Sequence, residues 1–172
     1  MPPRPVQTSP ASRRFAVVVA EFNRDLTDAL LQGCLAGFAE AGMNTNDISI
    51  VHVPGAFELP LACDRLAADQ EFAAIVALGA IVRGDTPHFD FVAKGCSEGL
   101  MRVMLDHKIP VIFGVLTTDT LAQAKLRCDA DHLCGSADEV ASRDEKETPR
   151  SNKGYESARA ALHMTSLVRG LT

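Results

Sequence analysis

The chain lacks the features that mark several specialised classes of protein. It contains no tryptophan and one tyrosine, and none of its apolar runs reaches the roughly 20 residues that a membrane-spanning helix requires. Its basic residues form no cluster and its net charge is −5, which disfavours binding to a nucleic-acid backbone. The sequence therefore predicts a protein that binds neither membranes nor nucleic acids.

Cysteine is present, but in a pattern that argues against a disulfide framework. The five cysteines are an odd number, and Cys34, Cys63 and Cys96 fall within apolar helical patterns. Reduced, buried thiols in a cytoplasmic protein are the expectation. Residues 1–13 are rich in proline, serine and arginine and have no apolar segment, unlike a secretory signal. We expect a flexible tail there, with a transit peptide as the alternative, and a single globular domain over residues 14–172.

Apolar runs alternate along the chain with helical patterns. Strands are expected at residues 15–20, 48–53, 72–82 and 111–116, and helices at 26–41, 58–68, 90–107, 120–127 and 154–169. The strands read as apolar on both faces, which is typical of a parallel sheet covered by helices on both sides. We therefore expect an α/β fold, a three-layer α/β/α sandwich with a four-stranded, mainly parallel, flavodoxin-like sheet. Ligands bind such sheets beyond the carboxyl ends of the strands.

Polar and aromatic residues gather where the predicted strands end. Phe22 follows the first strand, Glu58 the second, and Arg83-Gly84-Asp85-Thr86-Pro87-His88 the third. The third segment holds more chemistry than a turn requires. Its backbone amides, the Thr86 hydroxyl and the start of the following helix suit a phosphate. His88 suits proton transfer, Glu58 can accept from hydroxyls, and Phe22 offers a face for a flat ring.

Each of these residues also has an ordinary structural explanation. Phe22 could plug the seam between helix and sheet, and Glu58 could favour a helix N-terminus electrostatically. The Gly-Asp-Thr-Pro segment could be only a turn, and His88 only a surface histidine. Their collection at one edge of the sheet favours a binding site.

These residues resemble the 6,7-dimethyl-8-ribityllumazine synthase family over roughly residues 14–127 and 152–168. The matching segments are Phe22-Asn23, 54–58, 79–84, Thr86 with His88-Phe89, 109–117, Gln123-Ala124 with Arg127, and 152–154. The resemblance implies condensation of 5-amino-6-(D-ribitylamino)uracil with 3,4-dihydroxy-2-butanone 4-phosphate, with release of phosphate and water. This is the penultimate step of riboflavin biosynthesis, and it requires no metal or organic cofactor.

The resemblance also implies a role for individual residues. His88 and Arg127 would be catalytic. Substrate would be bound by Phe22, Asn23, Gly55, Ala56, Phe57, Glu58, Ala80, Ile81, Val82, Gly84, Asp85, Thr86, Phe113 and Lys153. Phe22 would stack on the pyrimidine, residues 55–58 would hold the ribityl chain, and residues 84–86 would face the phosphate. Phe113, Arg127 and Lys153 would come from the neighbouring subunit of a homo-oligomer.

Residues 128–151 depart from the family pattern as a polar, acidic insertion, expected to be a mobile loop. It leaves the position of Lys153 less secure than that of Arg127. It also disfavours a 60-subunit shell, so we expect a homopentamer or at most paired pentamers, with riboflavin synthase as a candidate partner. Four metal-capable residues lie in the insertion, Cys128, Asp131, His132 and Cys134, but their spacing matches no zinc pattern, so no metal is predicted.

Two other functions fit parts of the sequence. One is a non-catalytic flavin-binding, lumazine-binding or shell-forming protein on the same fold, which the presence of His88, Arg127 and Phe22 disfavours. The other is a flavodoxin-like nucleotide-binding domain. That domain would want a richer phosphate loop after the first strand than the residues at 21–25, Glu-Phe-Asn-Arg-Asp, provide.

Overall fold

The computed structural model describes residues 14–129, 131 and 151–171. The strands are β1 (Arg14–Ala20), β2 (Ser49–Val53), β3 (Phe72–Val82) and β4 (Val111–Thr118). The helices are α1 (Arg24–Glu40), α2 (Leu59–Ala68), α3 (His88–His107), α4 (Leu121–Lys125) and α6 (Lys153–Gly170), with a 3₁₀ turn at Thr45–Asp47. Among the described helices, none is both long and apolar enough to cross a bilayer. The expected tail at 1–13 and most of the insertion at 128–151 lie outside the described residues.

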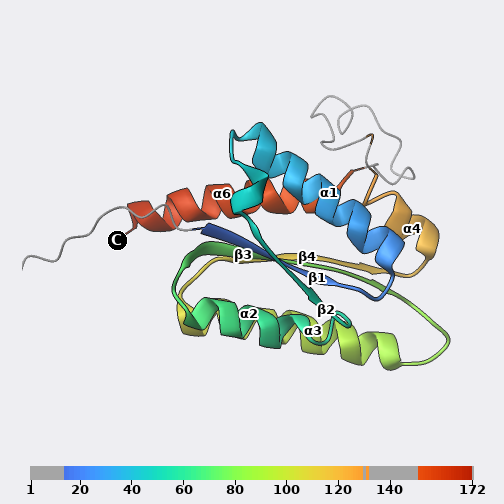
Figure 1. Cartoon of the computed structure of the whole chain (residues 1–172). Helices are drawn as coiled ribbons and strands as arrows, with labels where there is room; N and C mark the ends of the chain where they lie inside the picture. Colours follow the sequence, from blue (N-terminus) through green and yellow to red (C-terminus); the bar gives the residue numbers. More distant parts are fainter. Residues whose placement is uncertain (1–13, 130, 132–150, 172) are drawn as a thin grey trace, which may run out of the picture.

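The sheet is parallel throughout, in the order β2-β1-β3-β4. Helices α1 and α6 cover one face and α2 and α3 the other, which confirms the three-layer α/β/α architecture (Figure 1). All four strands therefore end at the same edge of the sheet. Their carboxyl ends lie near the start of α3 and near α4 (Figure 1).

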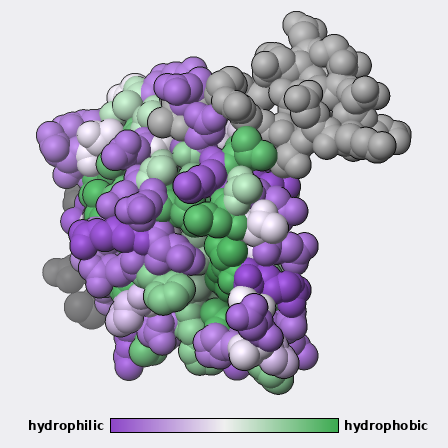
Figure 2. Space-filling model, turned by 90° about the vertical axis from the view of Figure 1, so that its right-hand side faces the viewer, coloured by the Kyte–Doolittle hydropathy of each residue, from purple (hydrophilic) through white to green (hydrophobic). Residues whose placement is uncertain are grey.

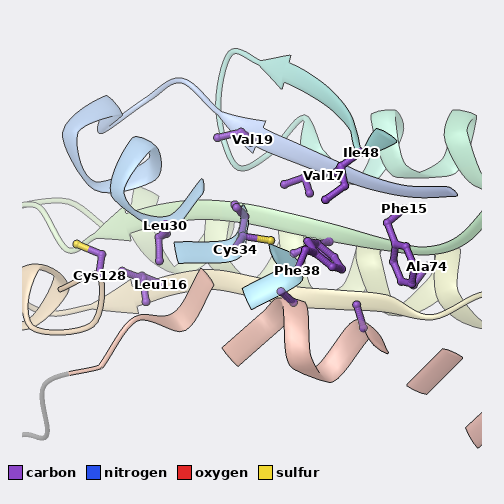
Figure 3. Packing of buried hydrophobic residues seen from close by; sticks show 14 of the residues in the cluster. Phe15, Val17, Val19, Leu30, Cys34, Phe38, Ile48, Ala74, Leu116 and Cys128 are labelled. Carbon is purple, nitrogen blue, oxygen red and sulfur yellow. The ribbon is translucent and has the colours of Figure 1, made fainter. Parts of the chain in front are cut away.

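The central strands are buried on both faces, so their side chains alternate between two apolar cores. Val17 and Val76 face the core under α1 and α6, while Val18 and Ala77 face the core under α2 and α3. Figure 3 shows the first core, in which Leu30, Cys34 and Phe38 of α1 lie against the sheet. The ring centroids of Phe15 and Phe38 lie 5.1 Å apart there. Continuous apolar sequence in β3 follows directly from this double burial.

The expectation that every strand is apolar on both faces is wrong for β2. Its residues alternate between partly buried and exposed, and the Ile50 side chain is 40% exposed. The reason is its position, because β2 is an edge strand that pairs only with β1. An edge strand has one flank without a neighbour, so the helices on either face cover it less completely.

Several boundaries differ from the predicted ones by one or two residues, and three of the differences bear on the site. Helix α3 begins at His88 and not at residue 90, so the histidine belongs to the first helical turn. Strand β4 continues to Thr118 because it stays paired with β3 as far as Val82. Helix α4 spans Leu121–Lys125 and not residues 120–127, because Thr120 is its N-cap. The Thr120 hydroxyl accepts from the Gln123 amide in a capping box.

Helices α1 and α6 approach closely, and their glycines make this possible. A methyl group at Gly154 would lie 1.8 Å from the carbonyl oxygen of Leu30, and one at Gly33 would lie 2.1 Å from the amide oxygen of Asn152. Asn152 itself is fully buried. Its side chain donates to the Ala29 carbonyl and accepts from the backbone amide of Gly154, capping α6 while tying it to α1. The Asn-Lys-Gly segment is thus the junction between these helices.

A short backbone ladder joins the two sides of the insertion. The amide of Ser151 donates to the Leu126 carbonyl over 2.9 Å, and the amide of Lys153 donates to the Arg127 carbonyl over 2.8 Å. Cys128 and Asn152 form an antiparallel bridge next to these bonds. We call residues 126–129 and 151–153 the stem. Lys153 is therefore held beside Arg127 across the stem.

Candidate functional site

A cleft of about 670 Å³ lies at the carboxyl ends of β1, β2 and β3. Figure 2 faces the end of the molecule where β3 runs into α3, and a band of hydrophobic surface crosses the middle of that face. The cleft is lined by Phe22, Pro54, Gly55, Ala56, Phe57, Glu58, Ala80, Ile81, Val82, Gly84, Thr86, His88, Phe89, Phe91 and Val92. The structure thus brings eleven of the sixteen site residues expected from the sequence into one cavity.

The loops after β1 and β2 are joined to each other by backbone hydrogen bonds. The amide of Glu21 donates to the Val53 carbonyl over 2.8 Å, and the amide of Phe22 donates to the Pro54 carbonyl over 3.1 Å. Phe22 is therefore placed by its backbone, while its side chain is 70% exposed. A phenylalanine that plugged a helix–sheet seam would be buried, so the structure disfavours that explanation. An exposed aromatic face at a cleft is suited to stacking on a flat ring.

Asn23 lies beside the cleft without lining it. Its backbone is left-handed, with φ of 61° and ψ of 47°, a conformation that asparagine tolerates better than most residues. Its side chain does not cap α1 but donates to the Ala80 carbonyl over 2.8 Å. Asn23 therefore fastens the loop after β1 to the end of β3.

Glu58 occupies the N-cap position of α2, where it makes no side-chain capping hydrogen bond. A methyl group at Gly55 would lie 3.1 Å from a Glu58 carboxylate oxygen, so the side chain reaches back over the preceding loop. Both residues line the cleft. Phe57 leans on α3, because a methyl group at Gly95 would lie 2.6 Å from its ring. This arrangement gives the cleft a carboxylate acceptor beside an aromatic wall.

The floor of the cleft is the end of β3. Ala80 and Ile81 are buried, and pairing of β3 with β1 stops at Leu78 while pairing with β4 continues to Val82. Successive strand residues direct their backbone polar groups to alternate edges. The Ala80 carbonyl faces Asn23 on the β1 side, so the backbone groups of Val82 face that side too, where β1 has ended. Those of Ile81 face β4, which limits the backbone contacts that Ile81 can offer a ligand.

The loop from Gly84 to His88 is exposed along its whole length. A methyl group at Gly84 would meet nothing within 4 Å, so packing of the chain does not require glycine there. Pro87 is the N-cap of α3 and no side chain caps that helix. Thr86, His88 and the uncapped amides at the start of α3 thus meet at one side of the cleft, an arrangement suited to an anion. Asp85, also expected at the site, is exposed and does not line the cleft.

Three expected residues lie on or after β4 and do not line this chain's cleft. Phe113 is on β4, at the edge of the sheet, and is 40% exposed. The Arg127 guanidinium donates to the Gln123 carbonyl over 2.9 Å, and the Lys153 ammonium lies 2.5 Å from a carboxylate oxygen of Glu156. Arg127 and Lys153 are neighbours through the stem.

Sequence reasoning missed Phe89, Phe91, Val92 and Pro54, which also line the cleft. The first three belong to the opening turns of α3, and His88, Phe91 and Val92 share one face at helical spacing. Placing the helix start two residues late concealed that face. The signal was the i, i+3, i+4 pattern counted from His88.

In the part of the chain that the structure describes, no three potential ligands gather to hold a metal ion. Cys128 is buried, its thiol lies 3.6 Å from the Lys125 carbonyl, and burial raises its pKa. Asp131 is exposed, while His132 and Cys134 lie outside the described residues.

The geometry agrees with a comparison against known families. A family model described as 6,7-dimethyl-8-ribityllumazine synthase matches residues 12–169, nearly the whole chain. The match spans every strand and helix of the fold except the last residue of α6, and all the residues that line the cleft. The chain therefore belongs to the 6,7-dimethyl-8-ribityllumazine synthase family, the transferases of riboflavin biosynthesis.

Proposed function

We propose that the protein condenses 5-amino-6-(D-ribitylamino)uracil with 3,4-dihydroxy-2-butanone 4-phosphate to form 6,7-dimethyl-8-ribityllumazine, phosphate and water. One observation carries the proposal: Phe22, Glu58, Thr86 and His88, which come from three different strand ends, line a single cleft. A flat ring, a polyol, a phosphate and a moving proton each meet a suitable group there.

The uracil substrate is assigned to the side of the cleft built by the loops after β1 and β2. Its ring stacks on Phe22, and its edge meets the backbone of Val82 at the end of β3, on the side where pairing with β1 has stopped. The ribityl chain runs along residues 55–58, where the Glu58 carboxylate accepts from its hydroxyls. The buried residues Ala56 and Ala80 have small side chains, which leaves room for the ring.

The phosphate substrate is assigned to the loop at 84–88. Thr86 and the uncapped amides of α3 donate to the phosphate oxygens, and the helix dipole favours the negative charge. The amine of the uracil attacks the butanone carbonyl, and water leaves as the imine forms. His88 moves protons as the imine forms and phosphate departs. No nucleophilic side chain is required because the nucleophile is part of the substrate, so holding the two reactants together is the main contribution.

The active site is proposed to be shared between neighbouring subunits. The cleft lies at one side of the chain, and Phe113, Arg127 and Lys153 lie on the β4 side, so a head-to-tail contact would bring the two together. Such contacts form a closed ring when the rotation between neighbouring copies closes. On α3, Phe91, Met101 and Leu105 fall on one face and are 55–71% exposed, which leaves an apolar strip for a second copy. Phe113 then closes over the ring and Arg127 pairs with the phosphate.

A pentamer is the proposed ring, on the strength of family membership and of the insertion, which disfavours a larger shell. The same membership supports riboflavin synthase as a partner. A cytoplasmic location is proposed because Cys34, Cys63, Cys96 and Cys128 are all buried free thiols, as is usual in a reducing compartment.

An absorbance assay tests the reaction. Mixing the protein with both substrates should produce the lumazine chromophore faster than the uncatalysed background, and sizing by light scattering should give the mass of five or ten chains. Absence of chromophore formation alongside tight lumazine or flavin binding would favour the non-catalytic alternative. A particle with the mass of a full shell would overturn the pentamer.

Subunit complementation tests the shared site. His88→Ala and Arg127→Ala each damage a different half of the cleft if the halves come from different chains. Co-assembly of the two variants should therefore restore activity, since random mixing puts both intact residues in about one cleft in four. The matched control is co-assembly of His88→Ala with Phe22→Ala, because both changes affect the same chain's half. Equal recovery from both mixtures, or none from either, would contradict the shared site.

A further inference from the structure

Arg83 stands at the start of the segment that enters the cleft, yet it does not line the cleft. Its guanidinium Nε donates to a carboxylate oxygen of Asp119 over 2.9 Å. Its two Nη atoms lie 3.1 and 3.3 Å from the carboxylate oxygens of Asp90. The guanidinium carbon also lies 4.1 Å from the centroid of the Phe89 ring. One side chain therefore contacts three residues on two other elements.

These contacts join the end of β3, the first turn of α3 and the residue that follows β4. The backbone of Arg83 is itself fixed, because its amide donates to the Thr118 carbonyl over 2.9 Å. Asp90 and Asp119 are 7 and 36 residues away from Arg83 in the chain. A planar guanidinium is suited to this task, since it can pair with two carboxylates and stack on a ring at once. A lysine ammonium offers one charge and no planar face.

The segment between these contacts has little other support. Residues 84–88 are exposed, and no side chain caps α3. The hydrogen bond from the Asp90 amide to the Pro87 carbonyl lies within the turn itself. Arg83, by holding Phe89 and Asp90, therefore fixes where the first turn of α3 starts and so where Thr86 and His88 face.

The two carboxylates also separate Arg83 from the substrate. Its pKa is raised, first by the hydrogen bond to Asp90 and then by that to Asp119. The guanidinium contacts go to Asp90, Asp119 and Phe89, and Arg83 does not line the cleft, so we assign it no contact with the phosphate. This distinguishes Arg83 from Arg127, whose guanidinium donates to a backbone carbonyl in this chain.

We propose that Arg83 is a positioning residue for the phosphate half of the cleft: it acts through Phe89, Asp90 and Asp119 to hold the loop at 84–88 in its binding geometry. The assignment to phosphate rests on the proposed function. The uracil half is held by other bonds, those of Glu21, Phe22 and Asn23. Loss of the Arg83 side chain should therefore weaken binding of the butanone phosphate and leave binding of the uracil unchanged.

The test compares Arg83→Met and Arg83→Lys with wild type in steady-state kinetics for each substrate. We expect KM for the butanone phosphate to rise about 10- to 100-fold, because the loop at 84–88 loses its binding geometry, and KM for the uracil to stay near its wild-type value. Arg83→Lys should recover little, because the ammonium lacks the planar fork. Asp119→Asn removes one partner from outside the loop and should shift the same parameter in the same direction.

Arg14→Met is the matched control. Arg14 pairs with Glu71, and its guanidinium carbon lies 5.4 Å from the Phe72 ring centroid. The variant therefore loses an ion pair and a cation–ring contact, as Arg83→Met does, but at the opposite end of the sheet. It should leave both KM values unchanged. Equal rises in both KM values for Arg83→Met, or no rise in either, would overturn the proposal.

Amide hydrogen exchange gives a readout that does not depend on the reaction. Exchange across residues 84–90 should accelerate in Arg83→Met and Asp119→Asn but not in Arg14→Met. If wild type makes no lumazine, the proposed function fails, and faster exchange would still support the positioning role. Unchanged exchange in both variants would overturn it whatever the kinetics show. Should Arg83→Met fail to fold, Arg83→Lys and Asp119→Asn carry both measurements.

Discussion

The side-chain amide of Asn23 donates to the backbone carbonyl of Ala80 over 2.8 Å, so the first residue before α1 is bonded to the end of the central strand. The two residues are 57 positions apart in the chain. The bond closes the sheet edge just where β1 and β3 stop pairing. The hydrogen bond thereby fixes two parts of the cleft, the loop after β1 and the floor on β3, relative to each other.

Asn23→Ala should lower the free energy of unfolding by about 1–3 kcal/mol. It removes the hydrogen bond and places alanine at a positive φ, which costs about 1–2 kcal/mol by itself. Asn23→Gly loses the bond but tolerates the backbone, so it should be the more stable of the two variants. Urea unfolding followed by circular dichroism measures both. Equal stability of all three proteins would show that the bond contributes nothing.

His88→Ala should slow turnover about 10²- to 10⁴-fold without abolishing it, the usual range for loss of a general acid–base group. The remaining rate would come from holding the substrates together. Because His88 is exposed, the folded state should survive the change. Initial rates of lumazine formation at saturating substrate measure the effect. A variant with the wild-type rate would remove His88 from the mechanism.

Gly84→Ala should impair binding of the phosphate substrate while leaving stability unchanged. A methyl group there meets nothing within the chain, so it would occupy space that the ligand needs. The expected result is a higher KM for the butanone phosphate at an unchanged melting temperature. Gly170→Ala, whose methyl group also meets nothing within 4 Å, is the control and should change neither quantity. An unaltered KM in Gly84→Ala would mean that the phosphate lies elsewhere.

Gly154→Ala should destabilise the fold strongly, since its methyl group would lie 1.8 Å from the Leu30 carbonyl oxygen. The two helices must separate to admit it, and such overpacking costs about 1–3 kcal/mol or more. Thermal unfolding of this variant beside Gly170→Ala isolates the steric effect from the change in residue type. If both variants melted together, the close approach of α1 and α6 would not matter for stability.

Buried thiols should make stability decline in alkaline solution. Burial raises the pKa of Cys34, Cys63 and Cys96 from 9.0 to about 12, with Cys96 adding to the shift at Cys63. Between these values the unfolded chain loses protons that the folded chain keeps. The stabilisation is therefore complete below about pH 9 and is lost as the pH rises toward 12, with a slope of up to about 1.4 kcal/mol per pH unit for each thiol.

Urea unfolding at a series of pH values above 8 checks this decline. The variant Cys63→Ala has one titrating thiol fewer, so its free energy of unfolding should fall less steeply with pH than that of wild type. Identical slopes would exclude Cys63 as a contributor.

The layers and most of the cleft could be predicted because they follow from local patterns. Apolar runs such as β3 indicate buried parallel strands, and the rule that ligands bind at carboxyl ends then places Phe22, Glu58 and His88 together. The strand positions depend on side chains close in sequence. The edge position of β2 could not be predicted, because strand order is decided by packing between distant segments.

Contacts between residues far apart in the chain could also not be predicted from the sequence. Nothing in the local pattern shows that Asn152 bonds to Ala29, 123 residues away, or that Arg83 pairs with Asp119. Resemblance identified the Asn-Lys-Gly segment as a family feature, but its packing between α1 and α6 emerges only in three dimensions. The start of α3 was also placed wrongly from the sequence, because no capping side chain marks its first turn.

The stem has a practical consequence for engineering this protein. The backbone hydrogen bonds of the stem hold both ends of the inserted segment together. A change in the length or composition of that segment should therefore leave the positions of Arg127 and Lys153 unchanged. The residues between the two sides of the stem could be replaced by foreign peptides, affinity tags or fluorescent reporters, since lengthening such a closed loop costs little free energy. In the proposed pentamer, the stem would display one such insert per protomer at equivalent positions.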